Sequence, residues 1–342
     1  MDFDIPAEAT EAAELAATIF ADNCTQERLR AAEADGDRFD ADLWHTLGEA
    51  GLIGLPLPDS AGGAGLGVLE ATAVLIEAGK KIAPVPLAHH QVAAMALAQF
   101  GGADNADLLA RSATGGVILT VAGPADRSGV HSVVPAATKA AAILVPVETE
   151  GQISVVVVTP DAPGVSIEPQ QLSDGELAGR ISITDPSALP TLGGADVAVW
   201  LDEHLRVAIT AYQLGVVDGA LALTSGYARK REQFGRAIGT FQAVSQRLAD
   251  GYIDVLGARL MLWQAAWRLS EGLPAATEVA GAALWAADAG HRLAHTTVHV
   301  HGGVGIDLDG EAHRYFTAAK RNEFLLGGTT AQARLIGAAL AS

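Results

Sequence analysis

The chain has 342 residues, 49% of them hydrophobic, so it can bury a large core of about two domains. Its 22 Lys and Arg face 40 Asp and Glu, and the net charge of −18 disfavours binding to nucleic acids and anionic membranes. A lone cysteine, Cys24, an acidic start at Met1–Asp4 and no apolar run of roughly 18 residues together predict a cytoplasmic protein without disulfides, signal peptide or membrane span.

Helical patterns open the chain. We expect a helix to begin after Pro6, and a second to be capped by Asp40 and ended by Gly51. Further helices are predicted over 68–79 and 87–100, with His89 and His90 as a pair on a helix surface. A Pro- and Gly-rich connection over 55–67 lies between the second and third helices, and its glycines lack the spacing and the preceding strand of a dinucleotide-binding fold.

The composition changes near residue 115, where short runs of β-branched residues begin. The predicted strands are 116–121, 142–147, 153–159, 180–184 and 196–201. Since no helical pattern separates them, we expect an antiparallel sheet domain rather than βαβ units. Long helices are then predicted over 205–230, 241–270, 275–301 and 311–340. The order predicts a helical domain (1–114), a middle β-domain (115–201) and a helical bundle (202–342).

A basic segment follows the first long helix. Arg229–Arg236 places four of the 22 basic residues in eight positions of an acidic chain. The planar fork of Arg matches phosphate oxygens, and Gly235 lets a ligand approach the backbone. Cations also stabilise the C-terminus of a helix, so charge alone leaves both interpretations open.

The residues around this segment make the interpretation specific. Tyr227–Gly235, with Ile238, Phe241-Gln242 and Leu248–Asp250, resembles the signature segment of acyl-CoA dehydrogenases. The resemblance implies the mostly α fold of that family, with an N-terminal helical domain, a small β-barrel-like domain and a C-terminal four-helix bundle. It also implies that Arg231 holds the pyrophosphate of a neighbouring subunit's FAD, and that the same cofactor is flanked by three further residues, Gln233, Phe234 and Gln242.

A glycine-rich stretch continues the resemblance. His299–Ile306 is similar to the family's Gln-x-x-Gly-Gly-x-Gly stretch, which implies that Gly302 and Gly303 let the backbone approach the AMP half of FAD. His299 stands in place of the usual Gln and can still form hydrogen bonds. A glycine-rich helix end is the alternative interpretation.

The catalytic base of the family is missing. Leu325–Thr329 aligns with a Tyr-Glu-Gly-Thr stretch whose Glu removes the α-proton, but this chain has Gly327 there, followed by Gly328 and Thr329. The position that carries the base in some relatives is Leu205. Glu323 is the nearest carboxylate in sequence, and a surface role is the alternative for it. A positioned base contributes roughly 10²- to 10⁴-fold in rate, so the loss is serious.

The resemblance implies an FAD-dependent oxidoreductase of lipid metabolism that dehydrogenates an acyl-CoA and passes electrons to an electron-transfer flavoprotein. The missing base is accompanied by flavin-facing stretches around 120–124 and 129–134 that are shortened and contain no Trp. In this the chain resembles the short subunit of heteromeric bacterial acyl-CoA dehydrogenases, several of which act in steroid catabolism. Such a chain forms an oligomer and completes the FAD site of a full-length partner. The alternatives are a homomeric flavoprotein oxidase or monooxygenase, and a non-catalytic structural subunit. The candidate cofactor residues are Arg231, Gln233, Phe234, Gln242, His299, Gly302, Gly303 and Thr329.

A metal site is the remaining alternative. His291, His295 and His299 recur every four residues and so share one helix face, which suits zinc ligation. No Cys or Glu at ligand spacing joins them, so we expect no metal.

Overall fold

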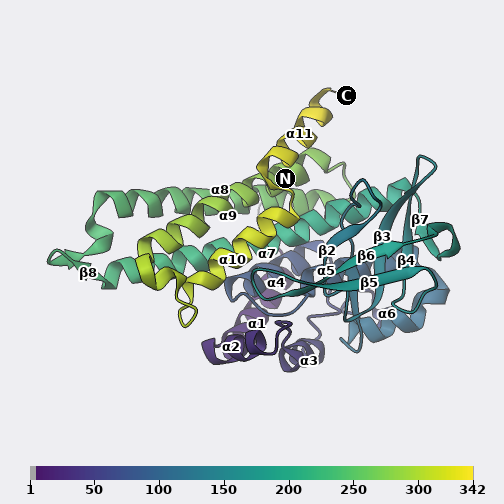
Figure 1. The fold of residues 1–342 in the computed structure, drawn as a ribbon, viewed down its shortest axis with the longest axis horizontal. Coiled ribbons are helices and arrows are strands. Elements are labelled where there is room, and N and C mark those ends of the chain that lie inside the picture. The colour runs from purple at the N-terminus through teal and green to yellow at the C-terminus, as the bar shows by residue number, and fades with distance from the viewer. Residues whose placement is uncertain (1–4, 342) are drawn as a thin grey trace. The chain divides into compact units, whose positions relative to one another are not determined.

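The structure is a computed structural model that describes residues 5–341. Its ribbon is drawn in Figure 1. The chain divides into two compact units, residues 1–71 with 84–208 and residues 72–83 with 209–342. Helices α4 (Val68–Lys80) and α7 (Ala195–Lys230) each begin in the first unit and end in the second. Each unit is described by itself.

Helices open the chain as the sequence predicts. Asp40 caps α3 by accepting a hydrogen bond from the Leu43 amide at 2.9 Å, which satisfies a donor that the first turn leaves free. The N-terminal helices are α1 (Ala7–Asn23), α2 (Gln26–Ala34), α3 (Ala41–Glu49), α4, α5 (Leu87–Phe100) and α6 (Ala106–Ala113).

The prediction of a surface histidine pair on α5 is wrong. His89 and His90 are both buried. His90 accepts a hydrogen bond from the Leu119 amide at 3.1 Å, and its other ring nitrogen lies 3.1 Å from the Ser112 carbonyl. Burial lowers the pKa of His90 to about 4, the Ser112 hydrogen bond opposing this, so the ring is neutral and joins α5, α6 and the first strand as a core group.

The first unit also contains two small sheets, ordered β1-β3-β4-β7 and β2-β6-β5. The strands are β1 (Ile118–Val121), β2 (His131–Pro135), β3 (Ala140–Thr149), β4 (Gln152–Val158), β5 (Val165–Gln171), β6 (Leu177–Ile183) and β7 (Thr191–Gly193). Pairing is antiparallel as expected except for β1 with β3, which is parallel. Between β1 and β3 the chain passes through β2, which belongs to the other sheet. It then returns so that β3 lies beside β1 and runs in the same direction.

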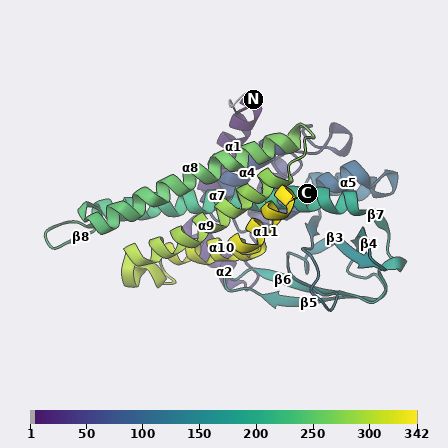
Figure 2. The same cartoon turned by 90° about the horizontal axis from the view of Figure 1, so that it is seen from above.

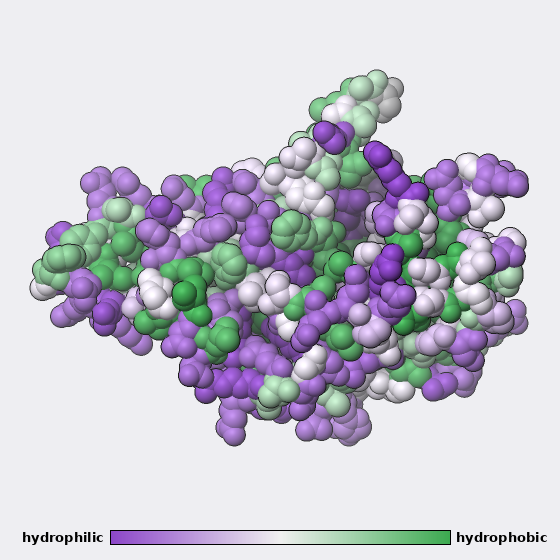
Figure 3. Space-filling model, in the orientation of Figure 1, coloured by the Kyte–Doolittle hydropathy of each residue, from purple (hydrophilic) through white to green (hydrophobic). Residues whose placement is uncertain are grey.

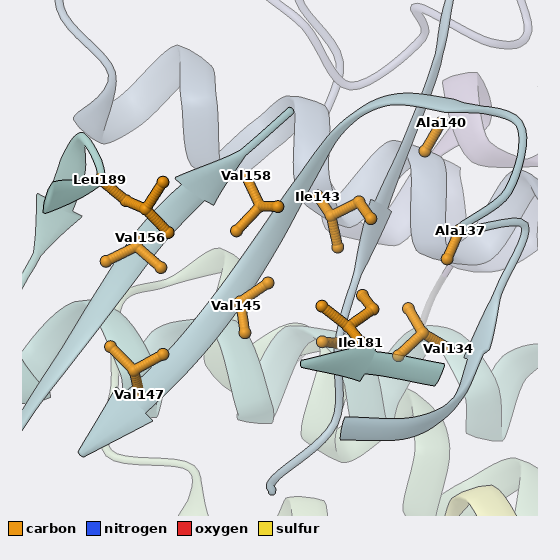
Figure 4. Packing of buried hydrophobic residues seen from close by; sticks show 11 residues of the cluster. Val134, Ala137, Ala140, Ile143, Val145, Val147, Val156, Val158, Ile181 and Leu189 are labelled. Carbon is orange, nitrogen blue, oxygen red and sulfur yellow. The ribbon is translucent and has the colours of Figure 1, made fainter. Parts of the chain in front are cut away.

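Valine and isoleucine side chains fill the space between these sheets (Figure 4). Val145 and Val156 pair across β3 and β4 and face Ile181 of the other sheet. Alternate residues of a strand share one face, so Ile143, Val145 and Val147 enter this core together. α5 packs against β1 on the other side.

The predicted strand over 196–201 is wrong, because this segment is the first part of α7. Val197 and Leu201 are buried one helical turn apart, so the apolar run follows a helical period rather than alternating. The predicted helix over 311–340 is two helices, α10 (Ala312–Leu325) and α11 (Gly328–Ala341), which separate at two left-handed glycines.

The second unit is a helical bundle of α7, α8 (Gln242–Ser270), α9 (Ala276–His301), α10 and α11, with α8 beside α9 (Figure 2). Glycines allow α4 and α7 to cross in close contact within this unit. A Cβ on Gly215 of α7 would lie 2.0 Å from the Ile76 carbonyl oxygen, and one on Gly79 would lie 2.0 Å from that of Tyr212. α7 is the described helix long and apolar enough to cross a membrane, and 72% of its most apolar window is buried, as in the core helix of a soluble protein.

Candidate functional site

The basic segment forms a tight hairpin after α7. Strands β8 (Glu232–Gln233) and β9 (Arg236–Ala237) pair antiparallel, and the Ile238 amide donates to the Arg231 carbonyl at 2.8 Å. The loop residues Phe234 and Gly235 have φ of +53° and +78°. Two left-handed residues are the signature of a type I′ turn, whose twist matches the strands. The hairpin therefore extends beyond the C-terminal end of α7, where β8 is labelled in Figure 1.

The cations of the hairpin are not neutralised within the chain. Arg229, Lys230, Arg231 and Arg236 are all exposed, and among residues 5–341 none of them forms an ion pair. Elsewhere in the acidic chain, by contrast, arginines such as Arg259 and Arg292 pair with aspartates. The hairpin thus concentrates free positive charge, as a polyanionic ligand requires.

Phe234, at the hairpin tip, combines an exposed ring with a left-handed backbone, and both are unfavourable in an isolated subunit. Its side chain is 93% exposed, and a left-handed backbone costs a non-glycine residue about 1 kcal/mol or more. Its ring meets that of Phe241 edge-on at 6.1 Å, and the Arg236 guanidinium lies 4.1 Å from the Phe241 ring centre. Gln242 follows, exposed, as the first residue of α8. The arrangement presents aromatic, cationic and amide groups outward.

A ring stack joins this hairpin to the glycine-rich stretch. Tyr227, one turn before Arg231, stacks on His301 with ring centres 4.3 Å apart. One turn earlier the Thr224 hydroxyl bonds to that of Thr297 at 3.1 Å. The C-terminal ends of α7 and α9 are therefore held together, although the motifs lie some seventy residues apart in the sequence. Neither contact was predicted, because spacing along two separate helices does not reveal which turns face each other.

The glycines after α9 leave an open surface. Gly302 has φ +64° and ψ −140°, a conformation that essentially only glycine adopts, and a Cβ on Gly302 or Gly303 would meet nothing within 4 Å. Gly305 differs, since a Cβ there would lie 2.7 Å from the Val298 carbonyl oxygen. His299, whose carbonyl accepts the Gly302 amide, is exposed beside them. The backbone at Gly302 and Gly303 is therefore open to close approach by a ligand.

Thr329 lies apart from the other candidate residues. It is in the first turn of α11, and both ribbon views place α11 away from the β8 hairpin within the second unit. Just before it, Gly327 and Gly328 have φ of +77° and +71°. Gly327, where the resemblance predicts the family base, therefore lacks a side chain and also has a left-handed backbone.

The alternative carboxylates are engaged or misplaced. Glu323 of α10 pairs with Lys320 at 2.5 Å and lies 3.3 Å from His291 of α9, so it belongs to a helix–helix contact. Glu203 of α7 has its pKa raised by burial and by Asp202. It is two residues from Leu205, so its side chain points about 200° away around the helix.

The three histidines on one face of α9 are exposed, and two of them contact other rings. His291 and His295 have ring centres 4.8 Å apart, and His295 meets Phe316 edge-on at 5.4 Å. Over the described residues, no group of three or more His, Cys, Asp or Glu is arranged to hold a metal ion.

The fold and this site define a class of protein. Residues 7–115 match the family model of the acyl-CoA dehydrogenase N-terminal domain, and residues 193–341 match that of the acyl-CoA dehydrogenase C-terminal domain. The chain belongs to the acyl-CoA dehydrogenase family, whose members are FAD-dependent oxidoreductases.

Particular relatives match over the whole length. Acyl-CoA dehydrogenase FadE27 of Mycobacterium tuberculosis is 44% identical, and the match covers 100% of this chain and 99% of the relative. A chain of the crystal structure of the ChsE4-ChsE5 complex from Mycobacterium tuberculosis superimposes with a TM-score of 0.94 at 44% identity, covering 100% and 99%. A chain of a Tcur3481-Tcur3483 steroid acyl-CoA dehydrogenase variant gives 0.92 at 38% identity, covering 99% of each.

Proposed function

We propose that this chain is the base-lacking subunit of a heteromeric acyl-CoA dehydrogenase and that it completes the FAD site of a full-length partner. The observation that carries the proposal is the unpaired cationic hairpin at Arg231, joined by the Tyr227–His301 stack to the open Gly302-Gly303 turn. The complexes named in two similar structures support the heteromer.

The residues of the second unit fit a flavin nucleotide. Arg231, with its exposed fork, would hold the pyrophosphate, and Gln233, Gln242 and His299 would supply hydrogen bonds around it. Phe234 would pack on the cofactor, which would bury a ring that is now 93% exposed. FAD when bound supplies the acceptor for the β-hydrogen, which leaves the substrate as hydride.

Removal of the α-proton is assigned to the partner. Gly327 carries no acceptor, Leu205 is aliphatic, and Glu323 is held by Lys320. A partner with a glutamate at either family position would supply the base. Thr329 belongs to α11, which lies away from the β8 hairpin in both ribbon views, and would then contribute to a different part of the assembled cofactor site.

The same proposal suggests a substrate, an electron acceptor and a cellular compartment. A steroid acyl-CoA is the first substrate to test, because one similar structure is named as a steroid enzyme. Electrons would leave through an electron-transfer flavoprotein, and the reaction would take place in the cytoplasm.

The decisive experiment compares the lone chain with its complex. The chain would be purified alone and together with a full-length acyl-CoA dehydrogenase subunit that carries the glutamate. Bound FAD and dehydrogenation of a steroid side-chain acyl-CoA would then be measured with a dye as electron acceptor. We expect FAD and turnover only in the complex. Full FAD occupancy and dehydrogenation by the lone chain would overturn the proposal, and oxygen-dependent turnover would instead indicate a homomeric oxidase or monooxygenase.

A variant tests the cofactor contact. Arg231→Ala in the complex should weaken FAD binding about tenfold to a hundredfold, since hydrogen bonds to charged groups contribute roughly 1.5–3 kcal/mol. Arg334→Ala is the matched control, because Arg334 is also exposed and forms no ion pair among the described residues. Unchanged FAD content in the Arg231 variant would indicate a structural subunit.

A further inference from the structure

A pair of stacked rings joins the C-terminal ends of α7 and α9. The planes of Tyr227 and His301 are inclined by only 25°, and the ring centres lie 4.3 Å apart. One turn deeper, Thr224 and Thr297 are both fully buried, and their hydroxyls lie 3.1 Å apart. α7 continues only to Lys230, where the exposed hairpin begins. The stack thus lies at the base of the hairpin, in the last turn of both helices.

The His301 ring is fixed in orientation, whereas Tyr227 contributes its ring alone. His301 is buried, and its Nδ1 lies 2.8 Å from the Thr297 carbonyl oxygen. A carbonyl oxygen can only accept, so Nδ1 carries a hydrogen and donates it, which holds the imidazole plane in place. The Tyr227 hydroxyl forms no hydrogen bond with residues 5–341, so this side chain contacts α9 through its ring. A phenylalanine at position 227 would keep that contact.

Two glycines let the segments on either side of the stack fold back against it. Gly239 follows the hairpin, and a Cβ there would lie 3.0 Å from the carbonyl oxygen of Ala228, the neighbour of Tyr227. Gly305 lies in the glycine-rich turn, and a Cβ there would lie 3.1 Å from the Cβ of His301 itself. The end of α7 therefore supports the hairpin, and the end of α9 supports the glycine-rich turn. The ring pair connects these two supports.

We infer that Tyr227 and His301 are positioning residues, which hold the hairpin and the glycine-rich turn at the separation that one FAD molecule needs to contact both. This inference rests on the proposed function, in which Arg231 binds the pyrophosphate and the glycine-rich turn lies against the AMP half. A ligand that spans two binding segments gains affinity when those segments are already ordered relative to each other. Loosening the stack leaves each segment intact and removes this gain.

The first test measures the Kd of FAD for the reconstituted complex. Tyr227→Leu and His301→Leu should each raise it about threefold to tenfold, the size of an aromatic pair interaction. Tyr227→Phe should retain the wild-type Kd, because the ring is kept. Saturating FAD should restore full turnover in all three variants, since neither ring touches the substrate. A Kd that stays unchanged in both leucine variants, or rises equally in Tyr227→Phe, would overturn the inference.

A matched control removes a different ring contact between helices of the same unit. Phe316 of α10 is half-buried and meets His295 of α9 edge-on at 5.4 Å. Phe316→Leu should lower the thermal stability of the chain about as much as Tyr227→Leu but leave the Kd of FAD unchanged. An equal rise of the Kd in the Phe316 variant would show that any loss of packing weakens FAD binding, and the positioning role would be rejected.

A double-mutant cycle tests whether Tyr227 acts through Arg231. In an Arg231→Ala complex, Tyr227→Leu should change the Kd of FAD by less than about twofold, because the contact that the stack positions is already lost. Fully additive effects would overturn the inference.

Hydrogen exchange in the lone chain gives a readout without FAD. The Ile238 amide donates to the Arg231 carbonyl at 2.8 Å, so it reports the order of the hairpin. We expect faster exchange of this amide in Tyr227→Leu and wild-type exchange in Tyr227→Phe and Phe316→Leu. Unchanged exchange in Tyr227→Leu would contradict the support of the hairpin by the stack.

This inference and the proposed function fail separately. If Arg231→Ala leaves the Kd of FAD unchanged, the proposed FAD contact is rejected. If Arg231→Ala weakens FAD binding while both leucine variants bind FAD as the wild type does, only the positioning role is rejected.

Discussion

Phe234 combines an exposed ring with a left-handed backbone. Neither feature stabilises the fold of a lone subunit. We predict that Phe234→Asn leaves the free energy of unfolding of the lone chain unchanged or raises it by up to about 1 kcal/mol, because Asn tolerates positive φ. The same change should lower FAD content in the complex. Urea unfolding and flavin absorbance measure the two effects. A clear loss of stability in the lone chain would contradict a tip shaped for a partner's cofactor.

Buried histidines predict how stability depends on pH. Burial lowers the pKa of His90 from 6.5 to about 4, opposed by its hydrogen bond to Ser112, so the unfolded chain binds more protons between these values. Stability should therefore fall as pH drops from about 6.5 to 4, by roughly 3 kcal/mol for this group. His204, buried and stacked on Trp200, should add a similar loss.

A substitution separates the contribution of His90 from that of His204. His90→Gln keeps an amide that can donate and accept but does not titrate, so its free energy of unfolding should change less between pH 7 and pH 4 than that of the wild type. Urea titrations at several pH values measure this. Parallel pH profiles for the two proteins would rule out His90 as the source.

The limits of the sequence are clearest at single residues. The motif around Arg231 could be recognised because its residue types are unusual in an acidic chain. His90 was misassigned since a polar residue in a helix suggests a surface, and only the fold shows that α5 has the Ser112 carbonyl and the Leu119 amide to satisfy it. The Tyr227–His301 stack depends on how two helices pack, which one chain's periodicity does not give.

Among elements, α7 depends most on small residues. A Cβ on Gly215 would lie 2.0 Å from the Ile76 carbonyl oxygen and 2.7 Å from the Lys80 amide nitrogen, both in rigid helix backbone. Gly215→Ala should therefore destabilise the chain by about 1–3 kcal/mol as α4 and α7 are forced apart. Gly226→Ala in the same helix, where a Cβ meets nothing within 4 Å, should be neutral or stabilise it by up to about 1 kcal/mol. Thermal unfolding checks both, and equal effects would contradict this account of the crossing.

Helices were predicted more reliably than strands. α5 has the predicted bounds, because its ends carry clear proline and glycine signals. The strands β2 and β5 were not predicted: β2 is short, and much of β5 is exposed and contains Pro169, so neither shows a strong apolar alternation. At 196–201 an apolar run suggests a strand, but its buried positions follow the period of α7.

For the whole chain, exposed apolar side chains are unevenly distributed. Thirteen of the seventeen exposed large hydrophobic residues in the described chain belong to the second unit. They include Tyr252, Ile253, Leu256 and Leu260 on α8, and green apolar residues also gather around the hairpin and on α11 in Figure 3. Surfaces of this kind are usually covered by a partner.

We therefore predict that the lone chain binds a hydrophobic dye such as ANS and self-associates, and that adding the full-length partner suppresses both. Light scattering after size-exclusion chromatography measures the association. A monodisperse monomer without dye binding would contradict the prediction that the second unit is an assembly surface.

The glycine pair between α10 and α11 has a consequence for the history of such a subunit. A single nucleotide change converts two of the four glycine codons to glutamate and the other two to aspartate, so a carboxyl group could arise at position 327 in one step. It would return to a backbone with φ of +77°, which costs a non-glycine residue roughly 1–2 kcal/mol and aims the side chain differently from a right-handed turn. If position 327 is that of the family base, as we propose, the left-handed main chain as well as the missing side chain would oppose the return of a working base, and the subunit would stay dependent on its partner.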